Sequence, residues 1–245
     1  MRRADTRSHG PGEGGDAEPR AFLKYTFYKV RPEWRLLDTA TKKAQRAELA
    51  ALLRTLETDV TMRCYSLTGI RADADFMVWA IDRRLETFQD IARRIASTGM
   101  GRHLDTAYAF LAASRRSVYL GGHEHPGEEG ATAKRVPLDR RYLFVYPFTK
   151  KREWYSIPFE KRQAIMREHF RVGHKYPSVT IHTGYSFGID DQEFMLAFET
   201  DEPLDFLDLV TDLRSSEASK YTERETPIFT CLFATPESML EALGT

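Results

Sequence analysis

The hydrophobic pattern divides the chain into short strands and amphipathic helices, beginning near residue 21. In the first half, runs rich in aromatic and β-branched residues predict strands at 21–30, 60–70, 76–81 and 108–120. Apolar residues that recur every three or four positions predict helices at 47–57 and 85–104. The predicted order of elements is therefore β-α-β-β-α-β.

The second half repeats this order. Strands are predicted at 141–148, 179–189, 193–199 and 226–234, and helices at 164–176 and 204–221, with a short terminal helix at 239–243. Aromatic landmarks stay in register between the halves. Glu33-Trp34 and Tyr65-Ser66 recur 120 residues later, and Phe76-Met77 and Phe88 recur 118 residues later. The pattern predicts an α+β protein built from a duplicated ferredoxin-like repeat (a dimeric α+β barrel), with antiparallel sheets and outer helices.

Two segments lack this pattern. Residues 1–20 contain Gly, Pro and charged residues with few apolar ones, and we expect a disordered tail. Residues 121–139 are rich in Gly and Glu and are longer than an ordinary connection, which predicts a linking loop or a functional flap. The expected organisation is a tail, a first repeat at 21–120, this loop, and a second repeat at 140–245 that carries the functional site.

Composition narrows the classes of function. The 36 basic residues balance 36 acidic ones, so nucleic acid is not an expected partner. No apolar run is long enough for a membrane helix, and no apolar segment follows Met1 as in a secretory signal. Cys64 and Cys231 lie far apart in strand-like contexts, as small buried residues of a reducing compartment would. We expect a cytoplasmic protein.

One histidine interrupts an apolar helix face. Ile165, His169 and Val172 share one face of the helix at 164–176, and the repeat places Leu49 at the position equivalent to His169. A histidine on an apolar face is often a satisfied core residue. Its occurrence in only one repeat favours a metal-ligating role, because a neutral imidazole in an apolar surface that excludes water binds iron well. Glu168 should point away, whereas Glu193 and Glu217 are both possible hydrogen-bond partners of this imidazole.

At these residues the chain resembles the chlorite dismutase superfamily, and most of all its coproheme decarboxylase branch, also called HemQ or heme-dependent peroxidase-like proteins. The resemblance covers about residues 21–234. It is carried by GIRADADFMVW, VYPFTKKREWYSIPFEKR, MREHFRVGHKYP, YSFGIDDQEFMLAFETDEPLDFLDLV, LRSSEAS and TPIFT. It implies a duplicated ferredoxin-like fold, a pocket for an iron porphyrin in the second half, and a homopentamer.

The resemblance also implies roles for particular residues. His169 matches the proximal histidine that binds iron, and Tyr146 matches the tyrosine that becomes a radical during propionate decarboxylation. Lys150 matches the lysine that accompanies this tyrosine. The remaining matches are to cofactor-binding residues, namely the pocket tryptophan Trp154 and the propionate contacts Arg214 and Ser219. Without the resemblance, Tyr146 and Trp154 would be interpreted as packing residues and Lys150 as a solvated one.

The distal side is where the match ends. Chlorite-degrading relatives carry an arginine thirteen residues after the proximal histidine, and many decarboxylases carry glutamine there. Counting gives His182, but alignment on Val179 and Ser186 gives Ile181, which we favour. An arginine, which would hold the anions of chlorite chemistry, is absent either way. The actinobacterial decarboxylases instead supply a distal histidine from the linking loop, where this chain has His123 and His125. The alternative is that both are solvated histidines of the loop.

These expectations favour an oxidoreductase that acts on iron coproporphyrin III (coproheme), which would be substrate and cofactor together. With hydrogen peroxide, it would convert propionates to vinyl groups by way of a tyrosyl radical and yield heme b. Alternatives are a chlorite dismutase or a peroxidase that uses heme b. A non-catalytic heme-binding or heme-sensing protein, and a relative that has lost heme, also remain open.

Overall fold

The computed structural model describes residues 20–115, 117–119 and 137–244. Its strands form a closed barrel. In the first half the strands are β1 (Phe22–Val30), β2 (Thr61–Ser66), β3 (Phe76–Asp82) and β4 (Leu104–Ala113). In the second half they are β5 (Tyr142–Lys150), β6 (Thr180–Tyr185), β7 (Phe194–Thr200) and β9 (Phe229–Ala234), with the short β8 (Thr222–Arg224) at the edge of β5. This confirms the predicted duplicated α+β fold.

The strand order explains how two repeats make one barrel. The first half has the order β4-β1-β3-β2 and the second has β9-β5-β7-β6, which is the same antiparallel ferredoxin-like order. The halves join where β2 pairs with β9 and where Ala113 of β4 pairs with Tyr185 of β6. Gly184 stands at the second junction, where an added Cβ would lie 2.6 Å from the Cβ of Ala112. A glycine is therefore required for β4 and β6 to approach this closely.

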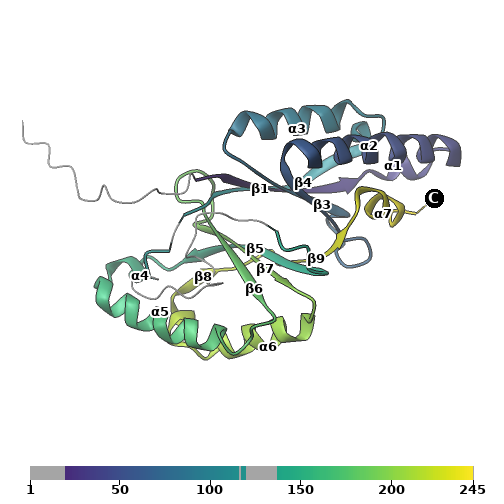
Figure 1. Ribbon diagram of the computed structural model, residues 1–245. Helices are drawn as coiled ribbons and strands as arrows, with labels where there is room; N and C mark the ends of the chain where they lie inside the picture. Colours follow the sequence, from purple (N-terminus) through teal and green to yellow (C-terminus); the bar gives the residue numbers. More distant parts are fainter. Residues whose placement is uncertain (1–19, 116, 120–136, 245) are drawn as a thin grey trace, which may run out of the picture.

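The helices cover the outside of the barrel in two layers on opposite sides (Figure 1). The first layer contains α2 (Thr39–Asp59) and α3 (Leu85–Ser97), joined by the terminal α7 (Pro236–Glu241). The second contains α5 (Phe159–Gly173) and α6 (Pro203–Arg214). Short helical turns complete the layers: α1 (Pro32–Arg35), η1 (Gly101–His103), α4 (Glu153–Ser156) and η2 (Glu217–Tyr221). Among the described residues, no helix is both long and apolar enough to cross a bilayer.

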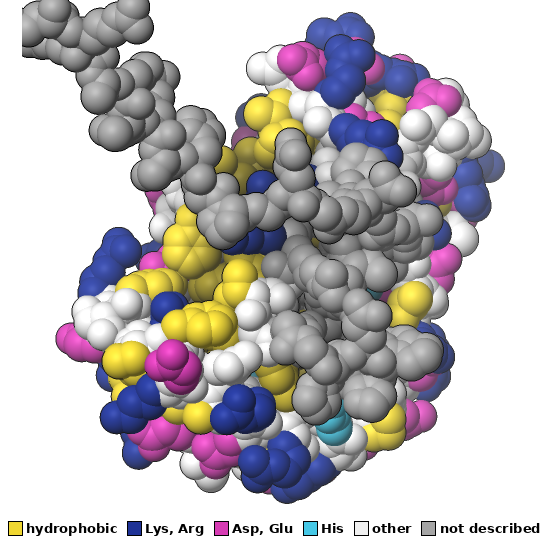
Figure 2. Space-filling view, turned by 60° about the vertical axis from the view of Figure 1, so that its left-hand side comes forward, with side chains coloured by type: hydrophobic (Ala, Val, Ile, Leu, Met, Phe, Trp, Pro, Cys, Tyr) yellow, Lys and Arg dark blue, Asp and Glu magenta, His cyan; other side chains and the backbone are white. Residues whose placement is uncertain are grey.

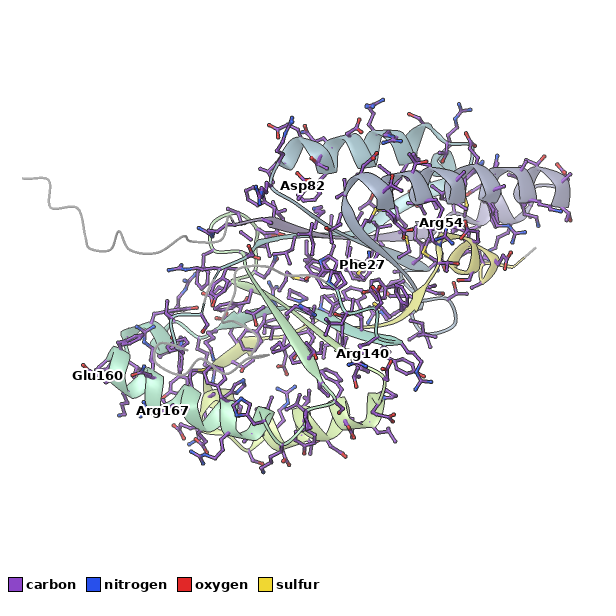
Figure 3. All side chains as sticks on the ribbon, in the orientation of Figure 1. Phe27, Arg54, Asp82, Arg140, Glu160 and Arg167 are labelled. Carbon is purple, nitrogen blue, oxygen red and sulfur yellow. The ribbon has the colours of Figure 1, made fainter. Side chains whose placement is uncertain are left out.

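Strand alternation assigns each residue of β5 to the barrel interior or to the second helix layer. Leu143 and Val145 belong to the buried cluster inside the barrel, which is centred on rings such as Phe27 (Figure 3). Phe144 and Tyr146 belong to a separate cluster beneath α6. The outer face of β5 therefore presents Tyr146, Phe148 and Lys150 to the second helix layer.

The structure corrects several predicted boundaries. The helix predicted at 164–176 begins earlier, at Phe159, because Pro158 is its N-cap and supplies the required extended backbone. The helix predicted at 204–221 ends at Arg214, and the Ser216 hydroxyl donates 2.7 Å to the Leu213 carbonyl oxygen before η2 begins. The strand predicted at 108–120 is β4, which ends at Ala113. The predicted tail, apart from Arg20, and residues 121–136 of the predicted loop lie outside the described residues.

Candidate functional site

The candidate site lies between the outer face of β5 and helix α5. His169 is in the third turn of α5 and is half-buried. Its Nδ1 is buried and has no hydrogen-bond partner among the described residues. Burial lowers the pKa of His169 to about 4, and the nearby charge of Lys150 acts in the same direction. The imidazole is therefore neutral at neutral pH, which is the form that can ligate a metal.

Neither carboxylate considered from the sequence contacts this imidazole. Glu217 is paired with Lys220 at 2.5 Å. Glu193 instead accepts a hydrogen bond from the backbone N–H of Lys150 (2.9 Å) and another from the Tyr155 hydroxyl (2.5 Å). Glu193 thus holds the end of β5 and the helical turn α4 together.

Lys150 is placed over an aromatic ring. Its Nζ lies 4.3 Å from the ring centroid of Trp154, which is 1% exposed, and 5.4 Å from that of Phe148. Burial lowers the pKa of Lys150 to about 8, although the charge of Glu193 opposes this shift. Lys150 forms no ion pair with any described residue. Its charge is therefore available to a ligand.

Tyr146 lies on the same face of β5 as Lys150, beneath the second helix layer. It is 6% exposed, and its ring stacks on Phe198 with 5.8 Å between centroids. Burial raises the pKa of the phenol, and the charge of Glu225 adds to this, while Arg214 opposes it. The phenol therefore stays protonated across the physiological range.

The two predicted propionate contacts lie next to each other where α6 ends. Arg214 forms an ion pair with Glu225, and both groups are close enough to shift the pKa of Tyr146. The Ser219 hydroxyl donates 2.7 Å to the Arg214 carbonyl oxygen, so the serine already has a hydrogen-bond acceptor within the protein. Arg214 is half exposed on this edge and faces the Tyr146 side of the site.

The structure separates the two distal candidates of β6. Ile181 packs in the apolar cluster of Tyr146 and Phe198, on the face of the sheet that α6 covers. His182 points into the barrel, where its Nε2 lies 2.7 Å from Glu199 Oε2 and its ring lies against Trp79. Adjacent strand residues face opposite sides, so only Ile181 lines the candidate site. His123 and His125 lie outside the described residues.

Two residues of the site had no signal that singled them out in the sequence. Tyr119 packs edge-on against Trp154, with 6.3 Å between ring centroids. Arg162 donates from Nη1 to the Tyr119 hydroxyl at 3.4 Å. The sequence shows that Arg162 precedes His169 by seven residues. That both residues lie on one helix becomes clear only because the helix begins at Phe159.

A hollow on the surface adjoins the site where β4 meets β6. It is lined by Phe22, Arg115, Tyr185 and Phe187, among others. Figure 2 shows hydrophobic and basic side chains close together on this side of the molecule. Phe187 contacts Phe194 (5.0 Å between centroids), which contacts Phe148 in turn, so aromatic rings connect the hollow to the Lys150 end of the site.

This arrangement fits an iron porphyrin. His169 offers a neutral imidazole with an unpartnered Nδ1, the outer face of the sheet offers apolar rings for a flat macrocycle, and Lys150 offers a positive charge for a carboxylate. Among the described residues, no three His, Cys, Asp or Glu side chains gather into a metal site, so His169 by itself would supply a single protein ligand.

Comparison with known proteins identifies the family of the chain. A model of the chlorite dismutase family matches residues 42–234 of the chain. The chain belongs to the chlorite dismutase family. Within that family it is similar to the coproheme decarboxylase of Mycolicibacterium smegmatis, with 32% identity over 223 residues, 85% of this chain and 88% of the relative.

Solved structures of other proteins share the fold. A mutant chlorite dismutase from Candidatus Nitrospira defluvii superposes with a TM-score of 0.81 at 25% identity, covering 90% of this chain and 94% of the other. A heme-binding protein from Thermus thermophilus gives a TM-score of 0.80 at 20% identity, covering 92% and 95% of the two chains. At that identity the second likeness shows the fold alone.

Proposed function

We propose that this protein is a coproheme decarboxylase, which converts propionate groups of iron coproporphyrin III to vinyl groups and yields heme b. The placement of Tyr146 carries the proposal: a buried, protonated phenol lies on the same face of β5 as Lys150, and the charge of Lys150 reaches His169. The 32% identity to a coproheme decarboxylase supports the same reaction.

Each residue has a separate task in this reaction. His169 would ligate the iron through its neutral imidazole, and the aromatic face of β5 and β7 would hold the macrocycle and exclude water. Lys150 and Arg214 would hold propionate carboxylates by charge. When bound, the iron porphyrin supplies redox chemistry with hydrogen peroxide. Each conversion consumes one propionate, one peroxide and one proton and gives one vinyl group, one carbon dioxide and two water molecules.

Tyr146 would transfer the hydrogen atom. Its phenol would lose a hydrogen atom to become a radical and then take one from the β-carbon of a propionate, which starts the loss of carbon dioxide. The apolar cluster around Tyr146 suits a neutral radical, because no charge has to be buried during the transfer.

We also propose the homopentamer that the resemblance implies, which light scattering on the purified protein would test.

The alternatives make different use of the same residues. Chlorite dismutation is disfavoured because the strand that faces the site presents Ile181, which offers no cationic donor for chlorite or its leaving group. A protein that only binds or senses heme would bind the porphyrin through His169 and leave its propionates unchanged.

Substitution Tyr146→Phe tests the proposal directly. The phenylalanine keeps the ring that stacks on Phe198 and removes only the hydroxyl. After loading with iron coproporphyrin III and titration with peroxide, mass spectrometry should find heme b with the wild type and unchanged coproheme with the variant. Formation of heme b by the variant at the wild-type rate would contradict the proposal. Wild-type protein that binds coproheme without converting it would favour a heme-binding role.

A further inference from the structure

Arg162 lies on the same face of α5 as His169, two turns nearer the N-terminus. The separation of seven positions corresponds to about 10 Å along the helix axis. The separation is close to the reach from the centre of a porphyrin to one of its propionate carboxylates.

The side chain of Arg162 is held in place without being neutralised. Its Nη1 donates to the Tyr119 hydroxyl at 3.4 Å, and its guanidinium lies 5.7 Å from the ring centroid of Phe159. Among the described residues, its buried Nε has no hydrogen-bond partner, and none of its nitrogens is ion-paired to a carboxylate. A partly buried cation with an unpartnered donor costs free energy, so the geometry points to a missing anion.

The surroundings of Arg162 favour an anion attached to a flat aromatic ligand. Tyr119 places its ring between Phe159 (5.9 Å) and Trp154 (6.3 Å). The Lys150 Nζ lies 4.3 Å from the ring centroid of the same Trp154. Two cations without an ion-pair partner among the described residues therefore border one aromatic cluster, at the end of the site where α5 begins.

We propose that Arg162 binds a carboxylate of the porphyrin whose iron is ligated by His169. The inference rests on the proposed function and adds a residue to it. The planar guanidinium fork matches a carboxylate in shape and charge, and Nε is one of the two nitrogens that such a fork uses. Arg162 would fix the rotation of the macrocycle about the iron, and with it the propionate that is presented to Tyr146.

The test is a titration of wild-type protein and of the Arg162→Gln, Arg162→Lys and Arg167→Gln variants with iron coproporphyrin III, followed by the Soret band. Arg167 is the matched control, because its substitution removes the same charge from the exposed outer face of the same helix (Figure 3). Arg162→Gln should weaken binding about 10-fold or more, Arg162→Lys should weaken it less, and Arg167→Gln should bind like the wild type.

A second ligand separates carboxylate binding from a structural role. With the tetramethyl ester of iron coproporphyrin in the same mild detergent, wild type and Arg162→Gln should bind equally. Equal weakening for acid and ester would overturn the inference, as would Arg162→Gln binding the acid as tightly as Arg167→Gln. If the wild type gives no Soret band that depends on His169, the proposed function fails and the inference fails with it. A His169-dependent band without an effect of Arg162 removes the inference alone.

Discussion

The two helix layers of this barrel come from the same repeated sequence pattern but are packed differently. Over the first half, 18 residues form one buried cluster beneath α2, α3 and α7. Over the second half, the buried residues form two smaller clusters of five and three. Leu49 is 1% exposed in the first layer, whereas its counterpart in the second layer is the half-buried His169.

The polar groups differ in the same direction. Val30 ends β1 and is buried, while Lys150 ends β5 at the equivalent position. In the first layer Trp34 donates from Nε1 to Gln45 at 2.9 Å, but its counterpart Trp154 lies under the Lys150 ammonium group. The first layer is thus a finished core, and the second leaves an imidazole nitrogen and two cations unpaired among the described residues. This difference is what we expect if the second layer binds a ligand and the first does not.

Exchanging Leu49 and His169, the equivalent residues of the two layers, should give the largest effect on stability. Leu49→His should destabilise the protein by about 3 kcal/mol, because it opens a sealed core and buries a polar ring without a partner. His169→Leu should stabilise the protein without ligand by about 1 kcal/mol, because it removes a buried unpartnered Nδ1. Urea unfolding of both variants measures these changes. Equal destabilisation by the two substitutions would mean that the layers are packed alike.

The fold could be predicted to a large extent because its signals are local. Aromatic runs, helical spacing and the registered landmarks at Trp34 and Trp154 lie within each repeat. A barrel was expected, but the strands that join its halves could not be identified from the sequence, because the pairing of β2 with β9 and of Ala113 with Tyr185 joins edge strands that are far apart in the chain. The start of α5 was also missed, since Phe159 follows a loop-like Ser-Ile-Pro segment.

The site was predictable only where one residue broke a pattern or matched a family motif. His169 stood out against Leu49, and alignment on Val179 and Ser186 favoured Ile181 over His182 as the distal candidate. In the structure Ile181 packs in the cluster of Tyr146, whereas His182 is bonded to Glu199 inside the barrel. The contact of Arg162 with Tyr119 could not be anticipated, because it joins α5 to a segment in the other half of the chain. Glu193 was weighed as a partner of His169, but in three dimensions it binds the backbone of Lys150 instead.

The acid stability of the two layers should also differ. The pKa of His169 is about 4 in the folded protein, below the value of about 6.5 in an unfolded chain. The unfolded state therefore binds more protons between these values, and the free energy of unfolding falls as the pH decreases from 6.5 towards 4. Wild type should lose about 1 kcal/mol more than His169→Leu between about pH 6.5 and 5, as measured by urea unfolding. Parallel pH profiles would show that the imidazole is not buried.

The smallest expected effect concerns the charge of Lys150. Its pKa of about 8 is lowered by burial and raised by Glu193, so coproheme affinity should fall a few-fold as the pH rises through 8. Glu193→Gln removes the group that raises this pKa, and the decline should begin at a lower pH. Glu160→Gln, on the exposed face of α5 (Figure 3), is the control and should leave the profile unchanged.

The central claim is that the second helix layer is incomplete without an iron porphyrin bound by His169. Soret titration with iron coproporphyrin III should be compared for wild type and His169→Leu, the variant that copies the finished first layer. Wild type should bind with a sharp Soret band and a raised unfolding temperature. His169→Leu should bind at least about 100-fold more weakly while remaining folded. Equal affinity and the same Soret band for both proteins would contradict the account.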